Sequence, residues 1–257
     1  MRTNLLQITV LGLAAAATLS AQAKHPDLSG TWAFGIDLPP LGLVVQKNGK
    51  TEGRVVDQSA RHGKVALKNA LPSQPKPSYK PELQAKQKDL FDHENKTDPV
   101  FYCGRPGTPR IGSPRRIVQL ANEIIFFYED ISGDPYRIIP TDGRKHDPDA
   151  NPTHYGQSIA HWEGDILVVD SRNFVEDTWF GEDGYFHSDQ MHVIERLWKD
   201  GDNLAWQAIV EDPKVLAQRW VMPERLIKPS SDPLLESPKC VDTDGPKLLN
   251  NDHHGQR

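Results

Sequence analysis

The sequence lacks several features that would assign a function directly. Its 30 lysine and arginine residues are outnumbered by 35 aspartate and glutamate residues, so no basic surplus is available to attract nucleic acid. It contains no Gly-x-Ser-x-Gly motif of a serine hydrolase and no glycine-rich loop that would cradle a nucleotide. We therefore expect neither a nucleic-acid partner nor a cofactor.

Long apolar runs are also scarce, and the only one stands at the N-terminus. Residues 1–23 contain the charged Arg2, an apolar stretch over roughly Ile8–Leu19, and an Ala-Gln-Ala sequence that ends at Ala23. This order is typical of a secretory signal peptide, and the apolar stretch is shorter than the ~20 residues of a membrane-spanning helix. The sequence predicts cleavage after Ala23 and a periplasmic or secreted mature chain outside the membrane.

Cysteine is rare, with Cys103 and Cys240 as the only examples. Two cysteines in an exported protein usually pair, because the compartment is oxidising. We predict a disulfide that joins the C-terminal tail, residues 229–257, to the rest of the chain. Two free thiols in a catalytic role are the alternative.

What the sequence does contain, from Arg115 onward, is a series of short β-branched and aromatic runs separated by turn residues. Short connections make neighbouring strands antiparallel. The pattern predicts a mainly β fold, an up-and-down meander of about seven to nine strands that closes into a lipocalin-like barrel, because closure removes exposed strand edges. A β-sandwich is the alternative. The runs are RIVQL, EIIFFYED, YRIIPTD, QSIAHW, DILVVD, MHVIERLWK and LAWQAIVED.

A single β domain over residues 24–228 accounts for this pattern. It carries a proline-rich insertion at about 54–114, in which Pro81 can occupy the first position of one short helix that continues over Glu82–Asp92.

Two resemblances agree with this fold. Gly30, Thr31 and Trp32 form a Gly-x-Trp motif that resembles the first strand of lipocalin-like barrels, in which the tryptophan plugs the closed end. From about Asp27 to Pro213 the chain also resembles a large group of secreted bacterial proteins of unassigned function. The second resemblance implies an exported β-rich domain and no particular reaction. Its motifs are CGRPGTPR, FFYED, YRIIPTDGRKH, WEGDILVVD, TWFGEDGYFHSDQMHVIER and EDP.

The segment HSDQMHVIER, residues 187–196, combines groups that suggest a catalytic triad or a metal site. Adjacent residues of an extended chain point to opposite faces, which argues against a triad built from His187, Ser188 and Asp189. His187 and His192 also fall on opposite faces of a regular strand. They converge only if residues 187–190 form a loop, so we predict no metal site.

The same alternation turns Glu195 inward. It shares a face with Met191, Val193 and Leu197, and Trp206 belongs to the next strand. A buried carboxylate needs a partner or has a raised pKa. Two interpretations remain open: a salt bridge to an interior arginine such as Arg137, or an acid–base group or ligand anchor inside a cavity.

Polar residues embedded in other apolar strands extend the candidate site. Glu129 and Arg137 flank one turn and are close enough to pair across strands. The candidates for acid–base catalysis are His187, Glu195, Tyr128 and His192. The candidates for ligand binding are Glu129, Arg137 and Trp206.

Three functions follow from these predictions. The first is an exported barrel that binds a small apolar or aromatic molecule. The second is a cofactor-independent isomerase, lyase or hydrolase that uses acid–base residues in the barrel cavity. The third is an envelope interaction protein with a filled barrel.

Overall fold

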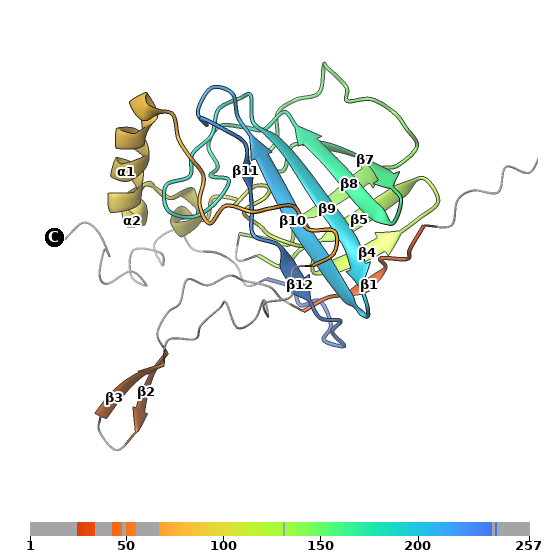
Figure 1. Ribbon diagram of the computed structural model, residues 1–257, viewed down its shortest axis with the longest axis horizontal. Helices are drawn as coiled ribbons and strands as arrows, with labels where there is room; N and C mark the ends of the chain where they lie inside the picture. Colours follow the sequence, from red (N-terminus) through yellow and green to blue (C-terminus); the bar gives the residue numbers. More distant parts are fainter. Residues whose placement is uncertain are drawn as a thin grey trace, which may run out of the picture.

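The computed structural model describes residues 25–33, 43–47, 50–54, 67–130, 132–237 and 240. The predicted signal peptide and most of the predicted tail lie outside the described residues. The fold is mainly β, with antiparallel sheets and a small helical segment at one side (Figure 1). Among the described residues, no helix combines the length and the apolar character needed to cross a membrane.

The strands form two main sheets, and every strand pairing is antiparallel, as predicted. The first sheet has the order β1 (Gly30–Thr31), β4 (Arg116–Gln119), β5 (Glu123–Phe127) and β6 (Tyr136–Pro140). The second contains β7 (Gln157–Glu163), β8 (Ile166–Arg172), β9 (His192–Asp200), β10 (Asn203–Glu211), β11 (Trp220–Val221) and β12 (Arg225–Ile227). A separate hairpin consists of β2 (Leu43–Lys47) and β3 (Lys50–Arg54).

Tight turns fix the register of the second sheet. Asp200 pairs with Asn203 across the β9–β10 turn, and Gly201 between them has a φ of 60° that a side chain would disfavour. This register places Glu195 opposite Ala208 and Trp206 opposite Leu197. Side chains that belong to the interior therefore stay on one face.

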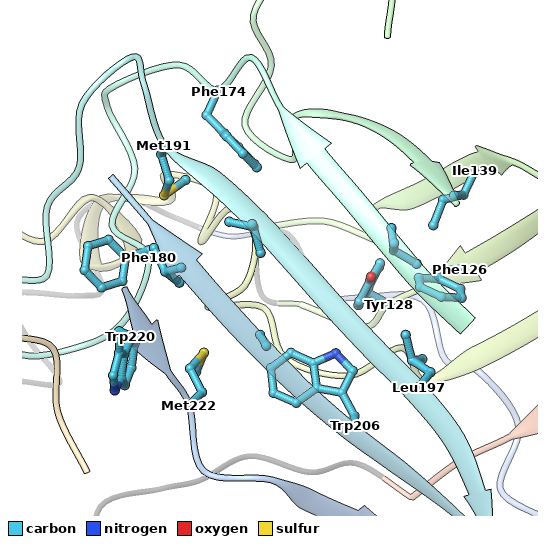
Figure 2. Close-up of a cluster of buried hydrophobic side chains, with 14 of the residues drawn as sticks. Phe126, Tyr128, Ile139, Phe174, Phe180, Met191, Leu197, Trp206, Trp220 and Met222 are labelled. Atoms are coloured by element: carbon cyan, nitrogen blue, oxygen red, sulfur yellow. The ribbon is translucent and has the colours of Figure 1, made fainter. Parts of the chain in front are cut away.

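Apolar side chains fill the space between the sheets. Phe126, Leu197 and Trp206 are completely or almost completely buried, and Figure 2 shows them close together with Tyr128 between the strands. Trp32, the tryptophan of the Gly-x-Trp motif, belongs to the same cluster and is also buried. Close packing of such large side chains is the main source of the stability of this core.

A backbone bridge joins the two sheets along one side, whereas along the other side β6 and β7 are neighbours that do not pair. Trp32, directly after β1, forms a β-bridge with Pro229, so β1 contacts both β4 and the chain that follows β12. On the other side, β6 pairs only with β5 and β7 pairs only with β8. In the described part of the chain the strands therefore form no closed ring, and a sandwich-like arrangement fits as well as a barrel.

The insertion contains the predicted helix. A 3-10 turn, Pro81–Leu83, leads into α1 (Gln84–Asp92), and the short α2 (Glu94–Thr97) follows. Cys103 and Cys240 form the predicted disulfide, which ties position 240 to the end of this insertion.

Candidate functional site

A buried polar network is centred on Arg137 in β6. The alternation of this strand exposes Tyr136 and Ile138 and turns Arg137 inward, where the residue is only 5% exposed. Its Nη1 donates to Glu195 Oε2 at 2.6 Å and to Tyr128 Oη at 3.0 Å. The guanidinium group is therefore the common partner of two predicted catalytic residues.

The other terminal nitrogen of Arg137 reaches the second sheet. Nη2 donates to Ser158 Oγ in β7 and to Ser171 Oγ in β8, each at 2.9 Å. The two hydroxyl groups lie 2.9 Å from each other. One side chain of β6 thus bridges the two sheets on the side where no backbone pairing joins them.

Glu195 is fully buried, with an exposed fraction of 0%, and both of its oxygens have donors. Oε2 accepts from Arg137, and Oε1 accepts from Trp206 Nε1 at 3.2 Å. The inward orientation predicted from alternation is correct, and the partner is the interior arginine of the salt-bridge interpretation. Further hydrogen bonds favour a buried ion pair of this kind, and each carboxylate oxygen of Glu195 accepts one.

Electrostatics keep the groups of this network in fixed protonation states. Burial alone would lower the pKa of Arg137, but the charge of Glu195 and the bond to it raise that pKa above its ordinary value. Burial raises the pKa of Tyr128, and the nearby arginine only partly opposes this. Arg137 is therefore a permanent cation and Tyr128 a neutral phenol near neutral pH.

The third guanidinium nitrogen of Arg137 has no partner among the described residues. Arg137 Nε is buried and has no hydrogen-bond acceptor in the described part of the chain. A buried N–H group without a partner costs about 1–3 kcal/mol, so an unmatched donor at such a position calls for an explanation.

A cleft lies beside this network, lined by residues of β6, of β7 and of the loop that joins them. Its volume is about 560 Å³, and both Arg137 and Ser158 contribute to its lining. The lining combines these two inward-facing residues with outward-facing residues of the two strands and with residues of the loop between them. The complete lining is Tyr136, Arg137, Ile138, Pro140, Arg144, Lys145, Asp147, Thr153, Tyr155, Gly156, Gln157, Ser158 and Ile159.

Two of the residues that line the cleft are large, exposed apolar side chains. Tyr136 is 62% exposed and Ile138 is 52% exposed, although both are large apolar side chains at alternate positions of one edge strand. Tyr155 also lines the cleft, and burial raises its pKa to about 12, so its hydroxyl group is protonated. Neighbouring exposed apolar groups around a concavity are typical of a ligand site.

The loop between β6 and β7 forms a charged rim. Arg144 is paired with Asp142 at 2.6 Å, and Lys145 follows it in the chain. The loop is anchored to β7, because the backbone N–H of Asp147 donates to Gln157 Oε1 at 2.9 Å. Two basic residues of this loop, Arg144 and Lys145, therefore line the cleft together with Tyr136 and Ile138.

The predicted histidines do not reach this cleft. His187 is buried beside Thr178, whose Oγ1 lies 2.8 Å from the Nε2 of His187, and its Nδ1 lies 2.9 Å from the backbone oxygen of Ser188. The Ser188 hydroxyl donates to Asp212 and not to His187. His187, Ser188 and Asp212 therefore lie together without the hydrogen-bond order of a catalytic triad.

His192 points outward, as alternation predicts, and joins a cluster on the opposite face of the second sheet. Its Nε2 lies 3.0 Å from Asp170 Oδ2, though without the alignment of a hydrogen bond, and its Nδ1 lies 3.2 Å from Glu211 Oε2. His146 Nε2 approaches the same Asp170 at 2.8 Å. No group of three or more His, Cys, Asp or Glu residues in the described ranges is placed to hold a metal ion.

The predicted ligand-binding residues separate. Of the three, only Arg137 lines the cleft, and Trp206 is buried in the core beside Glu195. The suggested pair between Glu129 and Arg137 is wrong: Glu129 Oε2 accepts instead from Arg115 Nε at 2.8 Å. Glu129 lies after the end of β5, where it meets Arg115 before β4, whereas Arg137 points into the core.

Sequence reasoning missed the cleft walls. Tyr136, Ile138 and Pro140 alternate along YRIIP, and this apolar outer face was the available signal. Lys145 and Tyr155 come from the following loop, where no periodicity indicates which face they join.

Comparisons of the chain with protein-family models, curated proteins and solved structures find no match in any of the three. The site geometry is consequently the basis for any functional assignment.

Proposed function

We propose that this protein is an exported, lipocalin-like small-molecule-binding protein whose site is the cleft between β6 and β7. The observation that carries the proposal is the cleft itself, about 560 Å³ in volume and walled by exposed apolar side chains. This volume lies within the range of about 300–1,000 Å³ that is typical of sites for small organic ligands.

The position of the site differs from that of a ligand held at the centre of a barrel. Phe126, Leu197 and Trp206 occupy the space between the sheets (Figure 2), which leaves the open seam as the favourable place for a ligand. An apolar or aromatic body would cover Tyr136 and Ile138 and would release the water that they now order.

Two further observations support the remaining parts of the proposal. The link between β1 and the chain after β12, made by Trp32, supports a barrel that is open only at the β6–β7 seam. The Cys103–Cys240 disulfide supports an oxidising compartment and therefore export.

Acid–base catalysis is the alternative function, and the same network bears on it. Tyr128 and Glu195 meet at Arg137, but both are buried and bonded to it, and His187 and His192 lie elsewhere. A reacting group needs direct access to its catalytic partner. The exposed walls of the cleft favour binding over chemistry at this network.

A matched pair of surface variants tests the proposal. A panel of fused-ring aromatic compounds is titrated into the mature protein, and binding is measured by calorimetry and thermal shift. Ile138→Ser should weaken the binding of any compound that binds by about tenfold, because it removes an apolar wall. Leu120→Ser is the control, since Leu120 is 48% exposed directly after β4 but does not line the cleft.

The result that would overturn the proposal is equally specific. Equal affinities of the two variants for every compound that binds, or no binding by any compound in the panel, would remove the cleft as a site for apolar or aromatic ligands.

A further inference from the structure

We infer that a second cavity, between α1 and the loop that carries Asp183 and Tyr185, binds a short neutral oligosaccharide. We call it the insertion cavity, because α1 and the proline-rich residues before it belong to the insertion at about 54–114. This inference is independent of the proposed function, since the lining of the β6–β7 cleft contains no residue of the insertion.

The insertion cavity has a volume of about 650 Å³, and three segments line it. This volume lies within the range of about 300–1,000 Å³ that is typical of small-ligand sites. The proline-rich residues 76–79 form one part of the lining, and Asp183 and Tyr185 form another. α1 contributes a single face, because its lining residues are three or four positions apart. These residues are Gln84, Gln87, Lys88 and Phe91.

Close contacts hold the loop against α1. Gln87 Nε2 donates to the backbone oxygen of Asp183 at 2.6 Å. Gly184, the next residue, has a φ of 72°, and a Cβ atom there would lie 2.7 Å from the backbone nitrogen of Phe91. Helix and loop therefore meet through their backbones. A cavity between segments fixed in this way loses little conformational entropy when a ligand binds.

Aromatic side chains give the insertion cavity a surface on which a sugar ring can pack. Tyr79, Phe91 and Tyr185 line it, and Tyr185 also lines a smaller cavity of about 220 Å³. The ring of Tyr185 is supported from within, because its centroid lies 5.8 Å from that of Phe180 and 6.5 Å from that of Tyr79. The C–H groups of a sugar ring are attracted to the negative face of an aromatic ring.

The polar groups of the lining include both acceptors and donors. The side chains of Gln84 and Gln87 use Nε2 for the backbone oxygens of Tyr79 and Asp183, which leaves their amide oxygens as acceptors. Lys76 is exposed and has no hydrogen-bond or ion-pair partner in the described part of the chain, so it remains a donor. A sugar hydroxyl both donates and accepts, and neighbouring hydroxyls match such a mixed set.

The charges of the lining favour a neutral ligand. Lys88 forms an ion pair with Asp92. Of the remaining ionised groups, Lys76 and Asp183 are equal in number and opposite in charge. A purely apolar ligand would leave the amide oxygens and the ammonium group desolvated without partners.

The test is a titration of the mature protein with three neutral trisaccharides: cellotriose, maltotriose and N-acetylated chitotriose. At least one should bind, with the largest amide chemical-shift changes in residues 76–79, in α1 and in residues 183–185. Its affinity should be the same at low and at high salt, because no net charge is neutralised. Trigalacturonate, a charged comparison of similar size, should bind no more tightly.

Gln84→Ala and Gln190→Ala form a matched pair of variants. Each replaces an exposed glutamine, but Gln190 does not line the insertion cavity. Gln84→Ala should weaken the binding of the trisaccharide about fivefold through the loss of a hydrogen-bond acceptor, and α1 should stay intact because alanine is a strong helix former. Gln190→Ala should leave the affinity unchanged.

Three results would overturn the inference. Absence of binding by all three neutral trisaccharides excludes the ligand class. Equal affinities of the two glutamine variants remove the insertion cavity as the site. Tighter binding of trigalacturonate that weakens at high salt replaces the neutral ligand by an anionic one. None of these results bears on the β6–β7 cleft.

Discussion

Replacing Glu195 by glutamine tests the physical basis of the buried network. Glu195→Gln keeps the shape of the side chain but leaves the buried cation of Arg137 without its counter-charge, 2.6 Å away in the wild-type protein. Removing one partner of a buried ion pair costs about 3–5 kcal/mol, because the other charge remains desolvated. We therefore expect the free energy of unfolding, measured by urea denaturation, to fall by this amount.

Two further variants make the result interpretable. The double variant Arg137→Met/Glu195→Leu removes both charges and should recover most of the stability, because apolar replacement of a whole buried pair is nearly neutral. Asp142→Asn breaks the exposed pair with Arg144 and should have little effect on stability. A loss below about 1 kcal/mol in Glu195→Gln would refute the argument, because an exposed pair behaves in that way.

Two other predictions concern the pH and redox dependence of stability. Burial lowers the pKa of His187 below its ordinary value of 6.5, so the unfolded chain takes up a proton first as the pH falls. This contribution to wild-type stability should therefore be fully present above pH 6.5 and should decrease as the pH falls from there toward the lowered pKa. His187→Gln should show a smaller decrease of the free energy of unfolding in urea titrations. Identical dependence of that free energy on pH in the two proteins would contradict this. The Cys103–Cys240 disulfide closes a sequence separation of 137 residues, so Cys103→Ser/Cys240→Ser should lower the free energy of unfolding by about 4–5 kcal/mol. An unchanged melting temperature in the double-serine variant would show that the bond contributes little.

Local patterns were sufficient to predict much of the fold. β-Branched runs with intervening turn residues located β4 to β10 in the correct order, and Pro81 located the start of the helical segment. Alternation also gave the inward side of Glu195 and the outward side of His192 correctly. These features depend on neighbours in the sequence, so the sequence alone specifies them.

The partner of Arg137 could not be chosen in the same way. Glu129 and Glu195 were both available, and the choice depends on how the first sheet packs over the second. In the structure Arg115 forms an ion pair with Glu129, and the inward side chain of Arg137 forms one with Glu195. Such a selection between distant segments is a property of the packed structure and not of any one strand.

The cleft and the histidine cluster could not be predicted from local sequence either. The cleft exists because β6 and β7 follow each other in the chain without pairing. No feature of the amino-acid composition indicates that these two strands do not pair. His146, Asp170 and His192 come from a loop and two different strands and meet only when the second sheet forms.

A map of amide chemical shifts during a titration with a fused-ring aromatic compound of the panel tests the central claim most directly. The account predicts that the largest changes occur at β6, Tyr136–Pro140, and at Gln157–Ile159 in β7, with smaller changes at Lys145. Changes centred on Leu197 and Trp206, between the sheets, would contradict it, because they would place the ligand in the interior and not in the cleft.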